Sequence, residues 1–446
     1  MSNEIIRISN MAKEYQKVDT VMYALNKENL KAGAKRMEIN KAVGIDNVTK
    51  QEYMEKLESN IESLIDRMKK MSYKPKAVKR VYIPKVGSDK KRPLGIPAFE
   101  DKIVQDVMTQ ILNAIYEPMF KEFSYGFRPG RNCHQAIAYL DKIINREKVN
   151  YIVDLDIKGY FDNIDHEWLI KFLEYRINDR VYIRYIRRFL KSGIIEQGKK
   201  LNSEKGTPQG GIISPVLGNI YLHFVLDDWF EKIVERRTRG YAGLVRYADD
   251  SVACFENKDE AELYLREVKR RLAKFGLEVS EEKTKILEFG RYATRNSKRR
   301  GEKKPKTFEF LGFTHCCSKT KEGYFKIIRK TSKKKFRAKV QETKKWLRKR
   351  MHSNVTETIK LLNIKLIGHY RYYGITDNIE SLRQYYEVVA YMLFKTLNRR
   401  TQRNKYSYKE YYEKIEKKIV RPRIYQDIIK MAYAMWRKWY MKSCVR

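Results

Sequence analysis

Apolar residues recur at helical spacing over the first 70 residues of the chain. The clearest stripe follows Thr49 and Glu52, which have the spacing of a capping box, a signal that starts helices. Its members are Tyr53, Leu57, Ile61, Leu64, Ile65 and Met68. The pattern predicts helices over residues 1–70, with this stripe packed on a core.

The pattern changes in the next part of the chain. Apolar runs at 82–84 and 94–97 flank the polar turn 87–90, which predicts a hairpin with a basic tip. Helical spacing returns over residues 100–116, and Pro118 ends this predicted helix because proline lacks the N–H that a helix needs.

Strands and helices are mixed over the middle of the chain. Residues 151–157 (YIVDLDI) predict a short buried strand, and a helix follows near Asp165. Ser214 and Pro215 are typical of the N-cap and first turn of a helix. Residues 244–255 predict a strand, a tight turn and a second strand. This order predicts an α+β domain.

The net charge of the chain indicates which kind of molecule it binds. The 446 residues include 95 Lys and Arg against 55 Asp and Glu, a net charge of +40. A hydrophobic content of 42% is enough for a real core and excludes intrinsic disorder. The charge predicts a polyanionic partner. The 32 tyrosines favour nucleic acid over an acidic membrane, because phenol rings stack on bases.

A soluble intracellular protein is expected. We find no run of 18 apolar residues, no amphipathic anchor, no lipidation motif and no signal-peptide pattern. The five cysteines contain no C-x-x-C pair, which disfavours a zinc ribbon or a disulfide framework. The adjacent Cys316 and Cys317 are interpreted as small residues of a strand.

The strongest charge lies over residues 291–350, which hold 23 Lys or Arg against 4 Glu. A domain boundary is predicted near 291–307, at a basic loop over 295–306. A narrow helical stripe follows, formed by Phe336, Val340, Leu347 and Met351. Like charges at this density repel, so an external polyanion is expected to neutralise them.

Acidic residues supply the first candidate chemistry. Asp249 and Asp250 follow Tyr247-Ala248 at the predicted hairpin tip, where two adjacent carboxylates are costly without a cation, although Asp is also common in ordinary turns. Asp156 ends an apolar strand and therefore needs a partner or a metal. Asp154 shares its strand face, so the periodicity does not choose between these two acids.

A glycine-rich segment supplies the second candidate. Residues 206–215 read GTPQGGIISP, and such glycines let a backbone approach a ligand closely, although a flexible loop before a helix has the same composition. The chain has no G-x-x-x-x-G-K-[ST] segment, which disfavours a P-loop ATPase.

Together these motifs resemble those of a known family. Asp156, the segment 207–210 (TPQG) and the segment 247–250 (YADD) resemble reverse transcriptases in type and order. Residues 206–222 (GTPQGGIISPVLGNIYL) and 124–131 (SYGFRPGR) resemble, more narrowly, group II intron reverse transcriptase-maturases. The resemblance extends over almost the whole chain, through GID at 44–46, RPLGIP at 92–97, FLGF at 310–313, GHYRYY at 368–373 and LNRR at 397–400.

The resemblance implies an α+β right-hand polymerase with fingers, palm and thumb. Residues 1–70 would be a helical N-terminal extension, 71–150 mainly the fingers, and 151–306 mainly the palm with the catalytic acids. Residues 307–446 would hold the primer-grip turn and a helical, basic thumb, called the maturase domain.

It also implies a metal site. The family's metal-binding Asp stands five residues before an aromatic that contacts the incoming sugar, and this chain has Phe161 five residues after Asp156. The resemblance thus selects Asp156, which with Asp249 and Asp250 would hold two Mg²⁺ ions. One ion would activate the primer 3′-hydroxyl, and the other would neutralise the departing pyrophosphate.

Further roles follow from the resemblance. Lys85 and Arg92 would clamp the triphosphate of the incoming dNTP, and Gln209 would lie against that nucleotide. Phe161 would be a steric gate against a 2′-hydroxyl, with a core aromatic as the alternative. Lys283 stands where some polymerases place a proton donor to pyrophosphate, with an exposed surface lysine as the alternative.

The nucleic acid would be held mainly by the thumb. Residues 310–313, which are Phe310, Leu311, Gly312 and Phe313, would form the primer grip. Lys333, Lys334, Lys335 and Arg337 would bind the duplex of RNA template and DNA primer, and the same surfaces would bind intron RNA.

The implied activity is an RNA-directed DNA polymerase that also assists splicing and mobility of a group II intron into target DNA. The alternatives are a splicing cofactor with a vestigial polymerase and a domesticated reverse transcriptase in defence or repair. The last ~50 residues lack His and paired cysteines, so no H-N-H endonuclease is expected. A cytoplasmic protein of bacterial type is expected, with no membrane partner and no oligomeric state predicted.

Overall fold

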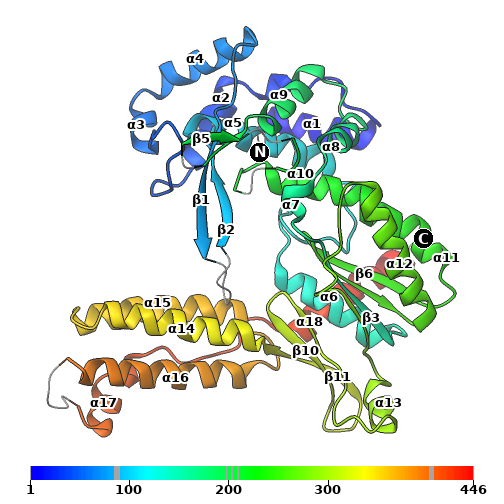
Figure 1. Ribbon diagram of the computed structural model, residues 1–446, viewed down its shortest axis with the longest axis vertical. Helices are drawn as coiled ribbons and strands as arrows, with labels where there is room; N and C mark the ends of the chain where they lie inside the picture. The colour runs from blue at the N-terminus through cyan, green and yellow to red at the C-terminus, as the bar shows by residue number, and fades with distance from the viewer. Residues whose placement is uncertain are drawn as a thin grey trace.

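The computed structural model describes residues 2–84, 91–196, 198–201, 204–207, 210–400 and 406–444. Figure 1 shows an upper body of helices carrying a long hairpin, a central body built on a sheet, and a lower body of long helices. The hairpin points from the upper body toward the lower helices. Mixed helices and strands confirm the predicted α+β class.

The upper body contains the predicted N-terminal helices. The capping box of Thr49 and Glu52 is present with both of its reciprocal hydrogen bonds, and Ile61, Leu64 and Met68 are buried as predicted. The helices of this body are α1 (Asn3–Glu14), η1 (Met22–Ala24), α2 (Lys27–Arg36), α3 (Lys50–Glu55), α4 (Leu57–Lys69), α5 (Phe99–Tyr116), α7 (Tyr160–Asn163), α8 (His166–Glu174) and α9 (Arg180–Leu190).

The predicted hairpin forms and belongs to a four-stranded sheet in the order β2-β1-β4-β5. Strands β1 and β2 are antiparallel, whereas β4 pairs with β1 in parallel. The strands are β1 (Val78–Pro84), β2 (Lys91–Ile96), β4 (Ile194–Glu196) and β5 (Lys199–Leu201). The tip of the hairpin lies outside the described residues.

The central body is an antiparallel sheet in the order β6-β7-β3-β8. Its strands are β3 (Tyr151–Asp156), β6 (Ala242–Tyr247), β7 (Asp250–Phe255) and β8 (Lys285–Glu288). The helices are α6 (Cys133–Arg146), α10 (Ser214–Leu222), η2 (His223–Asp227), η3 (Phe230–Val234), α11 (Glu235–Arg237), α12 (Lys258–Lys274) and α13 (Ala293–Arg299).

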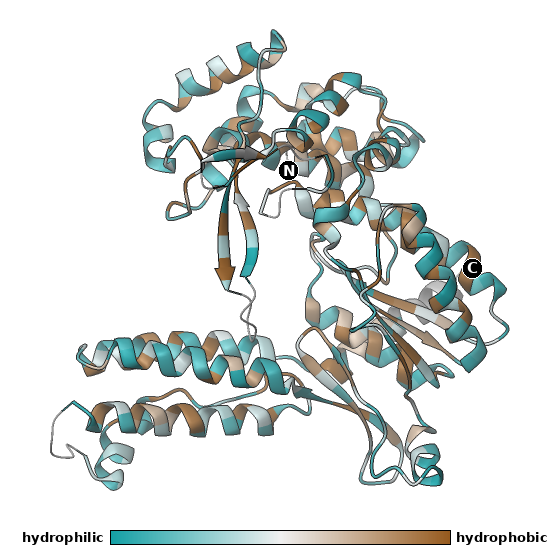
Figure 2. Cartoon of the chain, viewed as in Figure 1, coloured by the Kyte–Doolittle hydropathy of each residue, from teal (hydrophilic) through white to brown (hydrophobic). Residues whose placement is uncertain are grey.

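Both faces of this sheet are covered. On β7, Val252 and Cys254 pack into a core shared with α6, whereas Ala253 and Phe255 pack into the core shared with α10 and α12. Successive residues of a strand point to opposite faces, so a sheet covered on both sides needs a continuous apolar run. Figure 2 shows this apolar character along the strands.

The lower body joins a three-stranded antiparallel sheet to a helical bundle. Its strands are β9 (Phe308–Phe310), β10 (Phe313–Lys319) and β11 (Phe325–Thr331). Its helices are α14 (Lys333–Lys349), α15 (Val355–Tyr373), α16 (Ile379–Asn398), α17 (Tyr408–Lys414), η4 (Glu416–Lys418) and α18 (Ile428–Cys444). Helix α18 returns to pack beside α6 of the central body. Cys316 and Cys317 lie in β10, as predicted.

Two local features differ from the predictions made from the sequence. The predicted basic loop over 295–306 is wrong in its first part, because α13 extends to Arg299; Lys and Arg are good helix formers once their charges reach solvent. Helix α10 begins at Ser214 itself, so the residue at its N-cap is Ile213. Strands β4 and β5, for which no prediction was made, pair with the hairpin sheet although they follow β3 in the chain.

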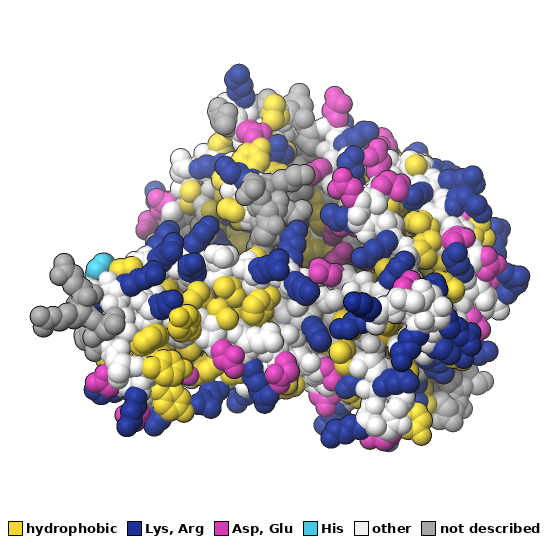
Figure 3. All heavy atoms as spheres, turned by 60° about the horizontal axis from the view of Figure 1, so that its bottom comes forward, with side chains coloured by type: hydrophobic (Ala, Val, Ile, Leu, Met, Phe, Trp, Pro, Cys, Tyr) yellow, Lys and Arg dark blue, Asp and Glu magenta, His cyan; other side chains and the backbone are white. Residues whose placement is uncertain are grey.

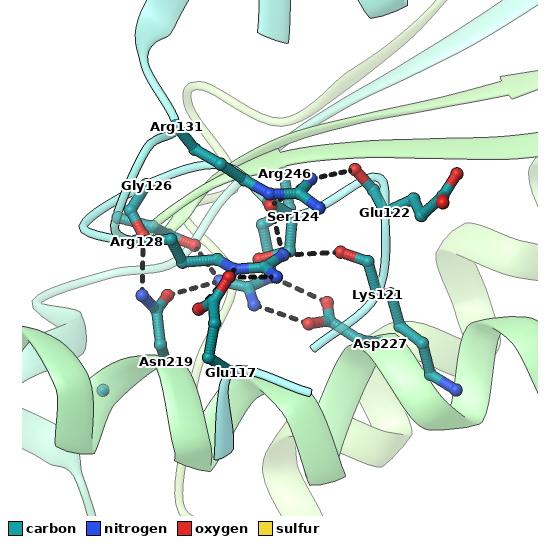
Figure 4. A network of polar contacts seen from close by, with 12 residues as sticks. Glu117, Lys121, Glu122, Ser124, Gly126, Arg128, Arg131, Asn219, Asp227 and Arg246 are labelled. Carbon is teal, nitrogen blue, oxygen red and sulfur yellow. Dashed lines mark hydrogen bonds and ion pairs between the residues drawn. The ribbon is translucent and has the colours of Figure 1, made fainter. Parts of the chain in front are cut away.

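A buried ion pair ties the central sheet to its helices. Arg246 of β6 and Asp227 of η2 are both fully buried, and the guanidinium donates to both carboxylate oxygens at 2.7 and 2.5 Å. The remaining Arg246 nitrogen donates to Asn219 Oδ1 at 3.1 Å and to the carbonyl of Ala248 at 2.9 Å (Figure 4). Removing one partner of a buried ion pair leaves the other charge unpaired in the core, which strongly lowers the free energy of unfolding.

Asp227→Ala is therefore expected to lower the free energy of unfolding by ~3–5 kcal/mol, because it leaves the Arg246 charge buried and unpaired. The matched control is Asp259→Ala, which breaks an exposed ion pair with Arg239 and is expected to cost ~0–1 kcal/mol. Urea denaturation measures both values. Equal losses in the two variants would contradict this account of the core.

Candidate active site

The sheet brings the separate acidic motifs together. In the pairing of β3 with β7, Asp156 stands directly opposite Asp250. Opposite residues of an antiparallel pair point to the same face, with Cβ atoms ~5 Å apart. Asp249 lies in the β6–β7 turn and immediately precedes Asp250. Three carboxylates from two distant parts of the chain therefore meet where the two central strands end. We call this end of the sheet its acidic edge.

The turn that carries Asp249 has a strained backbone. Ala248 has a φ of +56°, in the left-handed region that residues with a Cβ rarely adopt. The carbonyl of Ala248 accepts a hydrogen bond from the buried guanidinium of Arg246, and this contact fixes the position of the turn. Arg246 was not among the predicted site residues, although a charged residue within an apolar strand is a usable signal.

The structure separates the two acids that periodicity left equivalent. Asp154 shares the face of Asp156 but stands opposite Val252 on one side and Lys285 on the other. Lys285 Nζ lies 3.8 Å from its carboxylate. Asp156 is thus the residue opposite Asp250 at the turn, whereas Asp154 lies two residues further from the turn along β3.

The carboxylates at this edge repel one another. Desolvation, followed by the charges of Asp249, Asp154 and Asp156, raises the pKa of Asp250 to about 7, although solvent reaches its side chain. Desolvation also raises the pKa of Asp249, and the charge of Asp156 adds to this effect. Positive charge is therefore needed here for all the acids to ionise together.

Two basic side chains supply part of that charge. Lys283 Nζ donates to both carboxylate oxygens of Asp156, at 2.7 and 2.9 Å. Arg92 of β2 is exposed, and its charge lowers the pKa of Asp249, which places its guanidinium within electrostatic reach of the acids. The hairpin therefore presents a cation to the acidic edge of the central sheet.

The acids fit a hard divalent cation in their chemistry but are not gathered around one point. Carboxylate oxygens are the ligands that Mg²⁺ prefers. Among the described residues, no group of three or more His, Cys, Asp or Glu side chains is arranged to hold a metal ion. The carboxylate of Asp156 instead engages Lys283.

The glycine-rich segment docks on the stretch of chain that follows β3. Thr207 N–H donates to the carbonyl of Phe161 at 2.8 Å, and a Cβ on Gly206, whose φ is +82°, would crowd the same carbonyl. Phe161 is half-buried, and its ring edge packs on Gly218 of α10. Gln105 of α5, a buried residue that the sequence analysis missed, accepts from Ile212 N–H at 2.9 Å.

Two predicted nucleotide-binding residues, Lys85 and Gln209, lie outside the described residues. The adjoining Gly210 is described, and a Cβ there would overlap the carbonyl of Gly95 in β2. The glycine-rich segment therefore touches the hairpin that carries Arg92.

The predicted primer grip is a two-residue hairpin turn. Leu311 and Gly312 have φ values of +50° and +81°, as a type I′ turn requires, and they join β9 to β10. The flanking Phe310 and Phe313 pair with each other and are buried, so only the turn is available to a ligand. The side chain of Lys335 lies beside Gly312.

Basic side chains cluster where α14 begins. Lys333, Lys334, Lys335 and Arg337 are all exposed in its first two turns, and no acidic residue stands in the first turn. Cations at a helix N-terminus oppose the helix dipole, so this placement costs stability unless an anion binds there. Figure 3 shows Lys and Arg side chains spread over the lower body.

Among the described residues, no helix is both long and apolar enough to cross a membrane.

Comparison with known proteins gives one family and several relatives. The family model described as "Reverse transcriptase (RNA-dependent DNA polymerase)" matches residues 83–315. The chain is 39% identical over 248 residues to the group II intron-encoded protein LtrA of Lactococcus lactis subsp. cremoris, covering 53% of this chain and 41% of that protein.

Two further relatives give similar matches. Protein YkfC of Escherichia coli is 37% identical over 183 residues, which cover 40% of this chain and 48% of that protein. The putative COX1/OXI3 intron 1 protein of Saccharomyces cerevisiae is 30% identical over 245 residues, which cover 53% of this chain and 27% of that protein. The matched segments thus span less than half the length of these relatives.

Asp250→Asn is expected to raise the melting temperature of the metal-free protein at pH 8 by no more than about 2 °C, because solvent reaches this side chain and screens the repulsion. The folded pKa of about 7 lies above the ordinary 3.8, so stability falls as pH rises from 3.8 to 7 and the penalty is complete at pH 8. The gain should shrink at pH 5 and vanish below 3.8. Thermal melts in EDTA measure it, with the exposed Asp259→Asn as control; an equal gain at pH 5 and pH 8 would contradict the crowding of carboxylates.

Proposed function

Because the chain belongs to the reverse transcriptase family, we propose that it is an RNA-directed DNA polymerase that adds deoxynucleotides to a primer 3′-hydroxyl. The observation that carries the proposal is the β3–β7 register, which sets Asp156 opposite Asp250 beside the turn with Asp249. Nucleotidyl transfer assisted by metal ions needs anionic oxygen ligands for those ions, and this edge of the sheet supplies them.

Asp156, Asp249 and Asp250 would hold two Mg²⁺ ions. When bound, the ions neutralise charge on the attacking and leaving oxygens of phosphoryl transfer. The raised pKa values of Asp249 and Asp250 support this assignment, because carboxylates that repel one another gain most from a cation. No protein nucleophile is needed for the reaction.

The side chains around the acids would orient the nucleotide. Arg92 would bind the triphosphate, since a guanidinium makes paired hydrogen bonds to phosphate oxygens. Phe161 would close the sugar pocket against a 2′-hydroxyl, supported by its place five residues after Asp156 and its packing on Gly218. Lys283 would leave Asp156 and carry a proton to the departing pyrophosphate. The same resemblance assigns Lys85 and Gln209 to the nucleotide.

The template–primer duplex would pass between the acids and the lower body. The Leu311-Gly312 turn would hold the primer end, and the cluster at the start of α14 would bind phosphates. The side chain of Lys335 connects these two features, because it lies beside Gly312. Contacts of this kind read backbone and 2′-hydroxyl groups and not sequence.

A second partner would be a structured intron RNA. The relatives include a group II intron-encoded protein and an intron 1 protein, and the net charge of +40 favours a large RNA. Binding would stabilise one folded form of the RNA and assist its splicing, while the polymerase would copy it into target DNA. The RNA itself would carry out the splicing chemistry.

Primer extension on an RNA template with Mg²⁺ tests the proposal. Asp249→Ala and Asp156→Asn are each expected to lower the rate on the order of 10³-fold, because each removes charge stabilisation from the transition state. Asp154→Asn is the matched control and should retain activity within about tenfold, since its partner is Lys285 and not the turn. Binding of RNA should be unchanged in all three variants.

Two outcomes would contradict the proposal. Wild-type protein that binds RNA and aids splicing without making cDNA would favour a vestigial polymerase. Full activity in Asp156→Asn together with loss of activity in Asp154→Asn would show that Asp154, and not Asp156, is the metal ligand on β3.

A further inference from the structure

Phe127 has two unfavourable properties at once. Its φ is +54°, in the left-handed region where a bulky side chain is an outlier. Its side chain is nevertheless 53% exposed, so the ring gains little packing in return. Glycine would adopt this backbone conformation without strain. Among the described residues, Phe127 belongs to no hydrophobic core cluster that would repay the strain.

The residues on both sides of Phe127 are locked in place. Arg128 is buried, and its guanidinium donates to Glu117 and to the carbonyls of Lys121 and Ser124 (Figure 4). On the other side, the carbonyl of Gly126 accepts from Asn219 Nδ2 at 2.6 Å. The surrounding structure therefore imposes the strained conformation of Phe127.

The same segment is docked on the turn that carries the acids. A Cβ on Gly126 would overlap the backbone nitrogen of Ala248, so the two backbones are in direct contact. Residues 123–125 also pair with β6, through hydrogen bonds between the backbones of Tyr125, Phe123 and Arg246. The Cα of Phe127 is ~3.8 Å from that of Gly126, so its backbone lies one residue from this contact with the turn that carries Asp249.

We propose that Phe127 is a stacking platform for a base at the active-site end of the template–primer duplex. The proposal rests on the polymerase function and adds a binding residue to it. An exposed aromatic ring offers a base a planar apolar surface, and such stacking does not depend on base identity. The bound base would repay the strain that the free protein carries at this residue.

If Phe127 serves binding, replacing it should weaken duplex binding without lowering the melting temperature. A residue with a purely structural role would show the opposite pattern. Phe127→Gly is expected to keep or raise the melting temperature, because it relieves the left-handed conformation, and yet to weaken duplex binding. Phe127→Ala should bind as weakly, and Phe127→Tyr should restore binding. Phe127→Leu should fail to restore it, because stacking needs a ring and not only an apolar side chain.

Binding is measured by fluorescence anisotropy with an RNA template annealed to a DNA primer, at several salt concentrations. Phe127→Ala should raise Kd about tenfold at every salt concentration, because a neutral ring releases no counterions and leaves the salt slope unchanged. Lys334→Ala should instead reduce the slope by about 1. Tyr324→Ala is the control for an exposed aromatic away from the acids and should bind as the wild type does.

Two probes identify the stacked base. 2-Aminopurine is placed at the primer 3′ end in one duplex and at the templating position in the other. Loss of quenching on Phe127→Ala in either duplex supports the proposal and shows which strand is stacked. Unchanged quenching in both duplexes, wild-type Kd in Phe127→Ala, or a lowered melting temperature in Phe127→Gly would each overturn it.

This proposal and the polymerase function fail in different ways. If the polymerase function were wrong, the wild type would make no cDNA whatever Phe127 does to binding. If only the stacking proposal were wrong, the wild type would extend primers and Phe127→Ala would bind and extend them equally well.

Discussion

The buried guanidinium of Arg246 is the interaction on which the rest of the site depends. Its donors reach Asp227 of η2, Asn219 of α10 and the carbonyl of Ala248 in the β6–β7 turn. Asn219 in turn holds the carbonyl of Gly126. One side chain thus connects two helical segments, the central sheet and the segment docked on its edge. It also sets a positive charge beneath the turn at which the carboxylates collect.

The active-site edge balances repulsion against positions fixed by the sheet. The backbone register brings Asp156 and Asp250 together whatever their charges, because ladder hydrogen bonds and apolar packing on both faces determine it. The carboxylates are therefore held in a state that costs free energy, and desolvation together with their mutual repulsion raises the pKa of Asp250 to about 7. Lys283 and Arg92 relieve part of that cost, and a divalent cation would relieve the rest.

The sequence predicts the elements of this site better than it predicts their contacts. Short apolar runs located β3, β6 and β7, and the alternation of side chains along a strand placed Asp154 and Asp156 on one face. Only the register with β7 shows which of them faces the turn. Register depends on tertiary pairing, so a single strand does not contain it.

Other features required the folded chain. Arg246 finds Asp227 and Asn219 across 19 and 27 residues of sequence, and no local pattern specifies these partners. The strain at Phe127 likewise comes from contacts on both of its sides and not from the composition of its loop. By contrast, the predicted loop over 295–306 is wrong for residues 295–299, because local helix propensity is sufficient to form α13 despite the run of charge.

Iron-directed cleavage of the backbone tests most directly whether the acids share a metal site. Fe²⁺ bound in place of Mg²⁺, with ascorbate and peroxide, generates hydroxyl radicals that cut the chain close to the ion. We predict cuts near residue 156 and near residues 249–250 in the same protein, both suppressed by excess Mg²⁺. Cleavage at only one of these segments, or at neither, would contradict the account.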